Sequence, residues 1–187
     1  MSQSTQFISL SGLSGVMAGI YALIGAAFAN RILYPEIESI SFVNEIPPQL
    51  LLIAVVVLLL SIGTAYIMTL QKAKKMGESV WNASSKRLLV NFLIPLATGG
   101  IFCLLLMSQQ NYGLIAPVTL IFYGLACVNA SKYTLRDVRY LGITEIILGL
   151  TAVQFMGYGL YFWALGFGIC HIIYGTIMYF KYDRNSL

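Results

Sequence analysis

The sequence predicts an all-α membrane protein with six transmembrane helices arranged as three antiparallel hairpins. Hydrophobic residues make up 58% of the 187 residues, charged residues make up only 10%, and the mean hydropathy is +0.81. A soluble domain has about a quarter of its residues charged, so this chain lacks the polar residues to cover a water-exposed surface. Several apolar runs reach the ~20 residues that a spanning helix needs. We therefore expect one transmembrane domain that covers residues 1–187.

The six predicted spans cover residues 7–29, 48–70, 86–107, 113–131, 134–156 and 159–180. The second span begins at Pro48, where the first turn of a helix accepts proline. The fifth begins at Thr134, because Thr134 and Asp137 have the spacing of a capping box with Asp in place of Glu. A tight turn at residues 157–159 separates the fifth span from the sixth.

Glycine spacing predicts which helix faces pack closely. Six glycines lie at the expected packing positions: Gly15 and Gly19 in the first span, Gly142 and Gly149 in the fifth, and Gly168 and Gly175 in the sixth. Small residues let two helix backbones approach each other in lipid. We therefore expect the glycine faces of the last two spans to pack against one another.

The basic residues predict how the chain is oriented. Ten of the 11 lie at one end of the predicted spans: Lys72, Lys74, Lys75, Lys86, Arg87, Lys132, Arg136, Arg139, Lys181 and Arg184. Only Arg31 lies at the other end, which also holds an acidic loop with Glu36, Glu38 and Glu45. By the positive-inside rule, both termini are expected in the cytoplasm.

Two ionisable residues form a predicted buried polar pair in the last hairpin. Glu145 and His171 are the acid and the histidine that lie deep inside the spans, and each is 13 residues from Tyr158 in the turn. Both therefore lie roughly 20 Å down their helices. Two interpretations stay open: a proton-responsive pair that lines a polar pathway, or a buried hydrogen bond that locks the hairpin together.

Three further polar side chains, at Asn91, Thr98 and Asn129, are secondary candidates. Pro95 cannot donate the helical hydrogen bond to the carbonyl of Asn91, so this acceptor needs another partner. Asn91 and Asn129 are expected near the cytoplasmic surface, where asparagines more often form hydrogen bonds at helix ends than bind a substrate.

The sequence does not predict an enzyme. It contains no P-loop, no dinucleotide-binding motif, no metal-ligand cluster and no nucleophile–base spacing, and a single histidine argues against a metal centre. The three cysteines lie inside predicted spans and are expected to be small apolar fillers. The net charge of +4 lies at helix ends and does not indicate nucleic-acid binding. We expect no cofactor and no metal.

Glycines punctuate the last hairpin, at Gly142, Gly149, Gly157, Gly166 and Gly175. With this pattern, its length and its six predicted helices, the chain resembles the HdeD-like small membrane proteins. The resemblance implies a stress-related role in the bacterial inner membrane without known chemistry. It assigns no function to any single residue.

Two functions are compatible with these features. The first is a membrane scaffold, partner-docking or stress-related protein that lies in the lipid bilayer and forms a homo-oligomer or binds another membrane protein. The alternative is a channel- or transporter-like protein that passes protons or a small polar solute through a polar layer at Glu145 and His171. An aqueous cavity that reaches Glu145 would favour transport, and a dry, closely packed site would favour the scaffold.

The orientation is testable with reporter fusions. Fusions after Leu187 and within residues 72–86 should report a cytoplasmic location, and a fusion within residues 36–45 should report an external one. A fusion after Leu187 that reports an external location would mean that the number of spans is wrong.

Overall fold

The computed structural model describes residues 12–34, 47–77 and 79–184, and every regular element in these ranges is helical. The α-helices are α1 (Gly12–Leu33), α2 (Pro48–Met76), α3 (Ala83–Ser108), α4 (Ile115–Ala130), α5 (Val138–Gln154), α6 (Gly159–Trp163) and α7 (His171–Met178). The π-helical segment Ala164–Cys170 joins α6 to α7, and a second π-helical segment, Tyr179–Asp183, follows α7. Together they form one continuous helix that we call the C-terminal helix (Gly159–Asp183). The all-α class is thus confirmed for the described residues.

Five helices of the described residues are long and apolar enough to cross a membrane: Gly12–Leu33, Pro48–Lys75, Ala83–Ser108, Tyr112–Ala130 and Gly159–Asp183. They correspond to five of the six predicted spans. The remaining span is represented by α5, whose 17 residues extend about 26 Å at the helical rise, less than the ~30 Å of a bilayer core. The start of the first predicted span (residues 7–11) and the predicted acidic loop (residues 35–46) lie outside the described residues.

The predicted start of the fifth span is wrong. Thr134 lies in a bend and α5 begins only at Val138, with no side-chain hydrogen bond that caps it. The carboxylate of Asp137, which was expected to complete the capping box, instead accepts hydrogen bonds from Lys181 and Tyr182. A capping box does occur at the start of α3, between Asn82 and Ser85.

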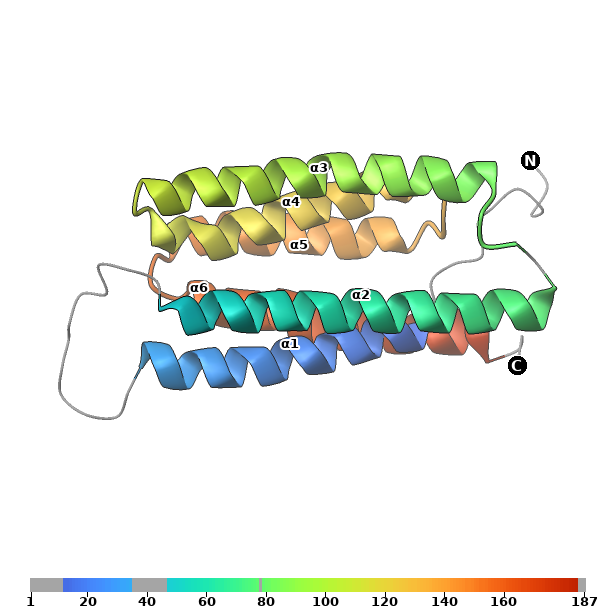
Figure 1. Cartoon of the computed structure of the whole chain (residues 1–187), viewed down its shortest axis with the longest axis horizontal. Coiled ribbons are helices and arrows are strands. Elements are labelled where there is room, and N and C mark those ends of the chain that lie inside the picture. Colours follow the sequence, from blue (N-terminus) through green and yellow to red (C-terminus); the bar gives the residue numbers. More distant parts are fainter. Residues whose placement is uncertain (1–11, 35–46, 78, 185–187) are drawn as a thin grey trace.

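The helices form two groups of three, which Figure 1 shows one above the other. In the first group, α1 packs against both α2 and the C-terminal helix. In the second, α4 packs against both α3 and α5. The connections from α2 to α3 and from α5 to α6 therefore cross from one group to the other (Figure 1). We call these groups the α1 group and the α4 group.

The glycine faces of α5 and the C-terminal helix do not pack against each other, which corrects the predicted pairing. Gly142 lies against α4, where an added Cβ would come within 2.6 Å of the Gly124 carbonyl oxygen. Gly149 lies against the same helix, because a Cβ there would come within 2.9 Å of the Pro117 carbonyl oxygen. The α4–α5 interface is therefore built on backbone contact.

The glycines of the C-terminal helix lie instead against α1. A Cβ on Gly19 would come within 2.6 Å of the Gly168 carbonyl oxygen, and one on Gly175 would come within 2.6 Å of the Val16 nitrogen. A Cβ added to Gly15 would lie 3.3 Å from the Cα of Gly175. Helical spacing identified these faces, but it could not identify the partner of each face.

A matched pair of substitutions tests whether the contact of α1 with the C-terminal helix needs glycine. Gly19→Ala should lower the free energy of unfolding by about 1–3 kcal/mol, because the methyl group meets backbone that cannot move aside. Gly63→Ala in α2, where an added Cβ meets nothing within 4 Å, should be neutral or stabilising by up to ~1 kcal/mol. Denaturant unfolding in detergent micelles measures both. Equal effects of the two changes would contradict the close contact.

Candidate functional site

Three polar side chains from three helices meet inside the bundle. Tyr123 comes from α4, Glu145 from α5 and His171 from the first residue of α7. The Nδ1 atom of His171 lies 3.5 Å from Oε1 of Glu145, and its Nε2 atom lies 2.8 Å from the Tyr123 hydroxyl. The structure thus brings the two residues of the predicted pair together and adds Tyr123, which the sequence did not single out. We call these three residues the buried cluster.

The π-helical segment Ala164–Cys170 shapes the backbone beside the cluster. Within it, the carbonyl oxygen of Gly166 lies 3.0 Å from Nδ1 of His171 and accepts a hydrogen bond from the ring. π-helical turns are rare, and they are frequent at functional sites. Gly166 is also needed for space, because an added Cβ there would overlap Oε2 of Glu145. Glu145 therefore reaches His171 across the bare backbone of Gly166.

The hydrogen bonds fit a cluster of three neutral groups. The Gly166 carbonyl can only accept, so Nδ1 of His171 carries a proton, and in the neutral ring Nε2 accepts the proton of the Tyr123 hydroxyl. Among the described residues, neither carboxyl oxygen of Glu145 has a hydrogen-bond partner, and its distance of 3.5 Å from Nδ1 is beyond the usual N–H···O range. An ionised carboxylate without a donor is very costly in a protein interior. This geometry therefore fits a protonated Glu145 carboxyl.

Aromatic rings surround the imidazole of His171. The ring of Tyr123 lies 5.3 Å from it and the ring of Phe167 lies 5.8 Å from it, centroid to centroid. Phe92 of α3 packs edge-on against Tyr123, and Trp163 packs against Phe167. Leu120 is itself fully buried, and Glu145 has 0% of its surface exposed.

The secondary polar candidates form a different contact. Asn129 of α4 donates a hydrogen bond of 2.9 Å to the carbonyl of Asn91 in α3, which is the acceptor that Pro95 leaves without its helical partner. The side chain of Asn91 in turn donates to the carbonyl of Arg87. Thr98 donates to the carbonyl of Ile94 in its own helix and joins no other helix through that bond. The two asparagines therefore tie α3 to α4.

Two carboxylates at one end of the bundle were not predicted as functional residues. Asp183 is buried and accepts hydrogen bonds from the backbone nitrogen of Gly12, at 2.6 Å, and from Lys72, at 2.7 Å. A carboxylate at the start of α1 also interacts favourably with the helix dipole. Asp137 accepts hydrogen bonds of 2.7 Å from both Lys181 and Tyr182. These contacts close the end of the bundle at which α1 begins and the C-terminal helix ends.

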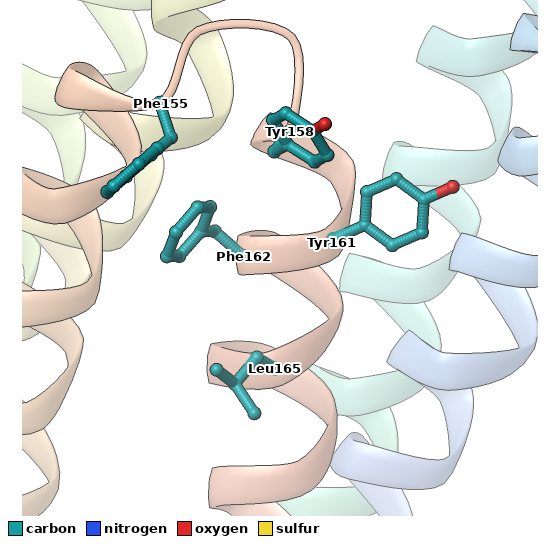
Figure 2. A pocket seen from close by; sticks show the side chains of 5 residues that line it. All are labelled: Phe155, Tyr158, Tyr161, Phe162 and Leu165. Carbon is teal, nitrogen blue, oxygen red and sulfur yellow. The ribbon is translucent and has the colours of Figure 1, made fainter.

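At the opposite end, α5 and α6 diverge around an apolar cleft of about 500 Å³ (Figure 2). Its lining consists of one aliphatic and four aromatic residues: Phe155, Tyr158, Tyr161, Phe162 and Leu165. In Figure 2 the rings of Phe155 and Phe162 face each other between the two helices, and their centroids lie 6.3 Å apart. The innermost lining residue, Leu165, directly precedes Gly166.

No family model, curated protein or solved structure matches this chain. The resemblance to the HdeD-like proteins stays a prediction. The fold and the site define a class: an all-helical chain with the build of a multi-pass membrane protein, with a polar cluster enclosed between its two helix groups.

A double-mutant cycle tests the contact between Glu145 and His171. Glu145→Gln and His171→Ala should each lower the free energy of unfolding, and together they should cost about 0.5–1.5 kcal/mol less than the sum. Thermal or denaturant unfolding in micelles gives the three values.

Thr151→Ala provides the matched control, because Thr151 also lies on α5 but forms its hydrogen bond with Ile147 of its own helix. Its effect should add to that of His171→Ala. Strict additivity of Glu145→Gln with His171→Ala would contradict the contact.

Proposed function

We propose that this chain is a membrane scaffold without catalytic chemistry, which encloses a polar cluster and docks a further transmembrane helix. The observation that carries the proposal is the complete burial of Glu145, which has 0% of its surface exposed and lies beside His171, whose ring packs against Tyr123 and Phe167. A transport pathway through this residue would need water or solute to reach it. A closed cluster supports a role in holding the two helix groups together.

The docking surface that we propose lies on α2 and α3. The apolar core of α2 has no buried residue, and Leu59 has 63% of its side chain exposed. Gly63 in α2 and Gly100 in α3 have nothing within 4 Å of an added Cβ, unlike the glycines that pack inside the bundle. Such small residues give a partner helix close access to the backbone. The partner is a transmembrane helix, from a second copy of this chain or from another membrane protein.

The orientation that we propose has both termini in the cytoplasm of a bacterial cell, with the chain in the inner membrane. The basic residues Lys72 and Lys75 lie at the end of α2, and Lys86 and Arg87 lie at the start of α3, at the same end of the bundle (Figure 1). The bond between Lys72 and Asp183 brings the end of the C-terminal helix to this place. A basic end of this kind is typical of the cytoplasmic side.

One observation favours the alternative of proton or solute transfer. Tyr123, His171 and Glu145 form a continuous row of ionisable side chains from three helices in the middle of the bundle. Ionisable residues inside spanning helices often mark pathways for protons.

One experiment distinguishes the two functions by placing a photo-crosslinking amino acid at Leu59, one helical turn from Gly63. In native membranes it should form protein adducts, which Gly63→Leu should abolish by blocking close approach. A crosslinker at Leu150 of α5, which is 59% exposed, is the matched control and should form lipid adducts only.

The purified protein is placed in liposomes that contain a pH-sensitive dye. The proton flux into these liposomes should be no greater than the flux into liposomes without protein. A proton flux that Glu145→Gln abolishes would establish the alternative. Equal protein crosslinking at Leu59 and Leu150 would contradict docking on α2.

A further inference from the structure

We propose that the buried cluster is a proton-operated switch that sets the spacing between α5 and the C-terminal helix. When Glu145 loses its proton, Nδ1–H of His171 changes its acceptor from the Gly166 carbonyl to the Glu145 carboxylate. This change draws α5 towards the C-terminal helix and narrows the apolar cleft between them. The inference does not depend on the scaffold function, because it concerns a movement inside the chain.

Two acceptors lie beside one ring proton. The Gly166 carbonyl oxygen lies 3.0 Å from Nδ1 of His171 and accepts its hydrogen bond. Oε1 of Glu145 lies 3.5 Å from the same Nδ1 atom. A protonated carboxyl attracts this N–H weakly, so the carbonyl holds it. A carboxylate attracts it much more strongly, since hydrogen bonds with an ionised partner are shorter and roughly twice as strong.

In the described part of the chain, no lysine or arginine forms an ion pair with Glu145. From α4, the ionisable groups that face the cluster are Tyr123 and Cys127, and Tyr123 is hydrogen-bonded to Nε2 of His171. From the C-terminal helix they are Cys170 and Tyr174 besides His171. Among the described residues, the ion pairs of lysine are formed with Asp137 and Asp183, not with Glu145.

The remaining neighbours contribute no charge to the cluster. The α1 helix faces the C-terminal helix through Gly15 and Gly19, and α3 approaches the cluster with the ring of Phe92. The nearest donor available to a Glu145 carboxylate is therefore Nδ1–H of His171.

The packing of the helices permits the movement. The glycines of α5 hold it to α4, and those of the C-terminal helix hold that helix to α1, so the two helices touch one another only sparsely. Asp137 joins α5 to Lys181 and Tyr182 at one end, and at the other end the turn of residues 155–158 connects α5 to α6 beside the apolar cleft (Figure 2). Glu145 lies between these two connections, so a pull there would draw the middle of α5 towards the C-terminal helix.

The switch can be followed by spin-label distances in liposomes. Labels on Leu150→Cys in α5 and Ile169→Cys in the C-terminal helix, both exposed positions outside the cluster, report the spacing across it. The native cysteines are replaced by alanine so that only these sites are labelled. The distance should shorten by roughly 1 Å as the pH rises, because the His171–Glu145 contact closes from 3.5 Å to about 2.8 Å.

The same titration is followed by infrared spectroscopy. The band of a protonated carboxyl should disappear over the same pH range as the distance changes, and Glu145→Gln should abolish both effects. A label pair on Leu125→Cys of α4 and Leu150→Cys is the matched control and should keep its distance, because α4 and α5 move together.

The wild-type measurement decides the inference even if Glu145→Gln fails to fold. A constant distance between the α5 and C-terminal labels over the whole titration would overturn it, and so would a pH-dependent distance that persists in Glu145→Gln. His171→Gln is the second variant, which should keep the protonated-carboxyl band but lose the change in distance.

Discussion

Backbone contact at glycine is the constraint on which the rest of this structure depends. Helices in a bilayer gain little from burying apolar side chains against one another, because lipid is equally apolar, so close van der Waals packing contributes much of their association. Here close backbone approaches join Gly142 to Gly124 and Gly19 to Gly168. The first builds the α4 group and the second builds the α1 group.

The use of glycine within each group leaves a distinct boundary between the groups. Glu145 reaches over Gly166 at this boundary, and His171 links it to the Tyr123 hydroxyl of α4. Apolar packing between α5 and the C-terminal helix is sparse, so polar contacts carry an unusual share of the connection. Buried carboxyl oxygens without a hydrogen-bond partner among the described residues are costly at such a place, which points to a role beyond packing.

The two ends of this boundary differ in chemistry. At one end Asp137 and Asp183 bind lysines and a backbone nitrogen through charge-assisted hydrogen bonds. At the other end the cleft between α5 and α6 is lined by aromatic and aliphatic side chains and is open. The boundary is therefore held by charged groups at one end, and at the other by the short turn between α5 and α6 with apolar rings beside it.

The sequence by itself determined the helical class, the approximate extent of most helices and the depth of Glu145 and His171. These features follow from the length of apolar runs and the fixed rise of a helix, which are local properties. The need of the Asn91 carbonyl for a partner was likewise predictable, since Pro95 removes its usual donor. Only the tertiary structure decided that Asn129 fills this role and that each glycine face packs against a different helix.

Helical periodicity identifies a face, but the partner of that face depends on how all the helices pack together. For the same reason, the roles of Tyr123 and Gly166 appear only once three helices are brought together in space.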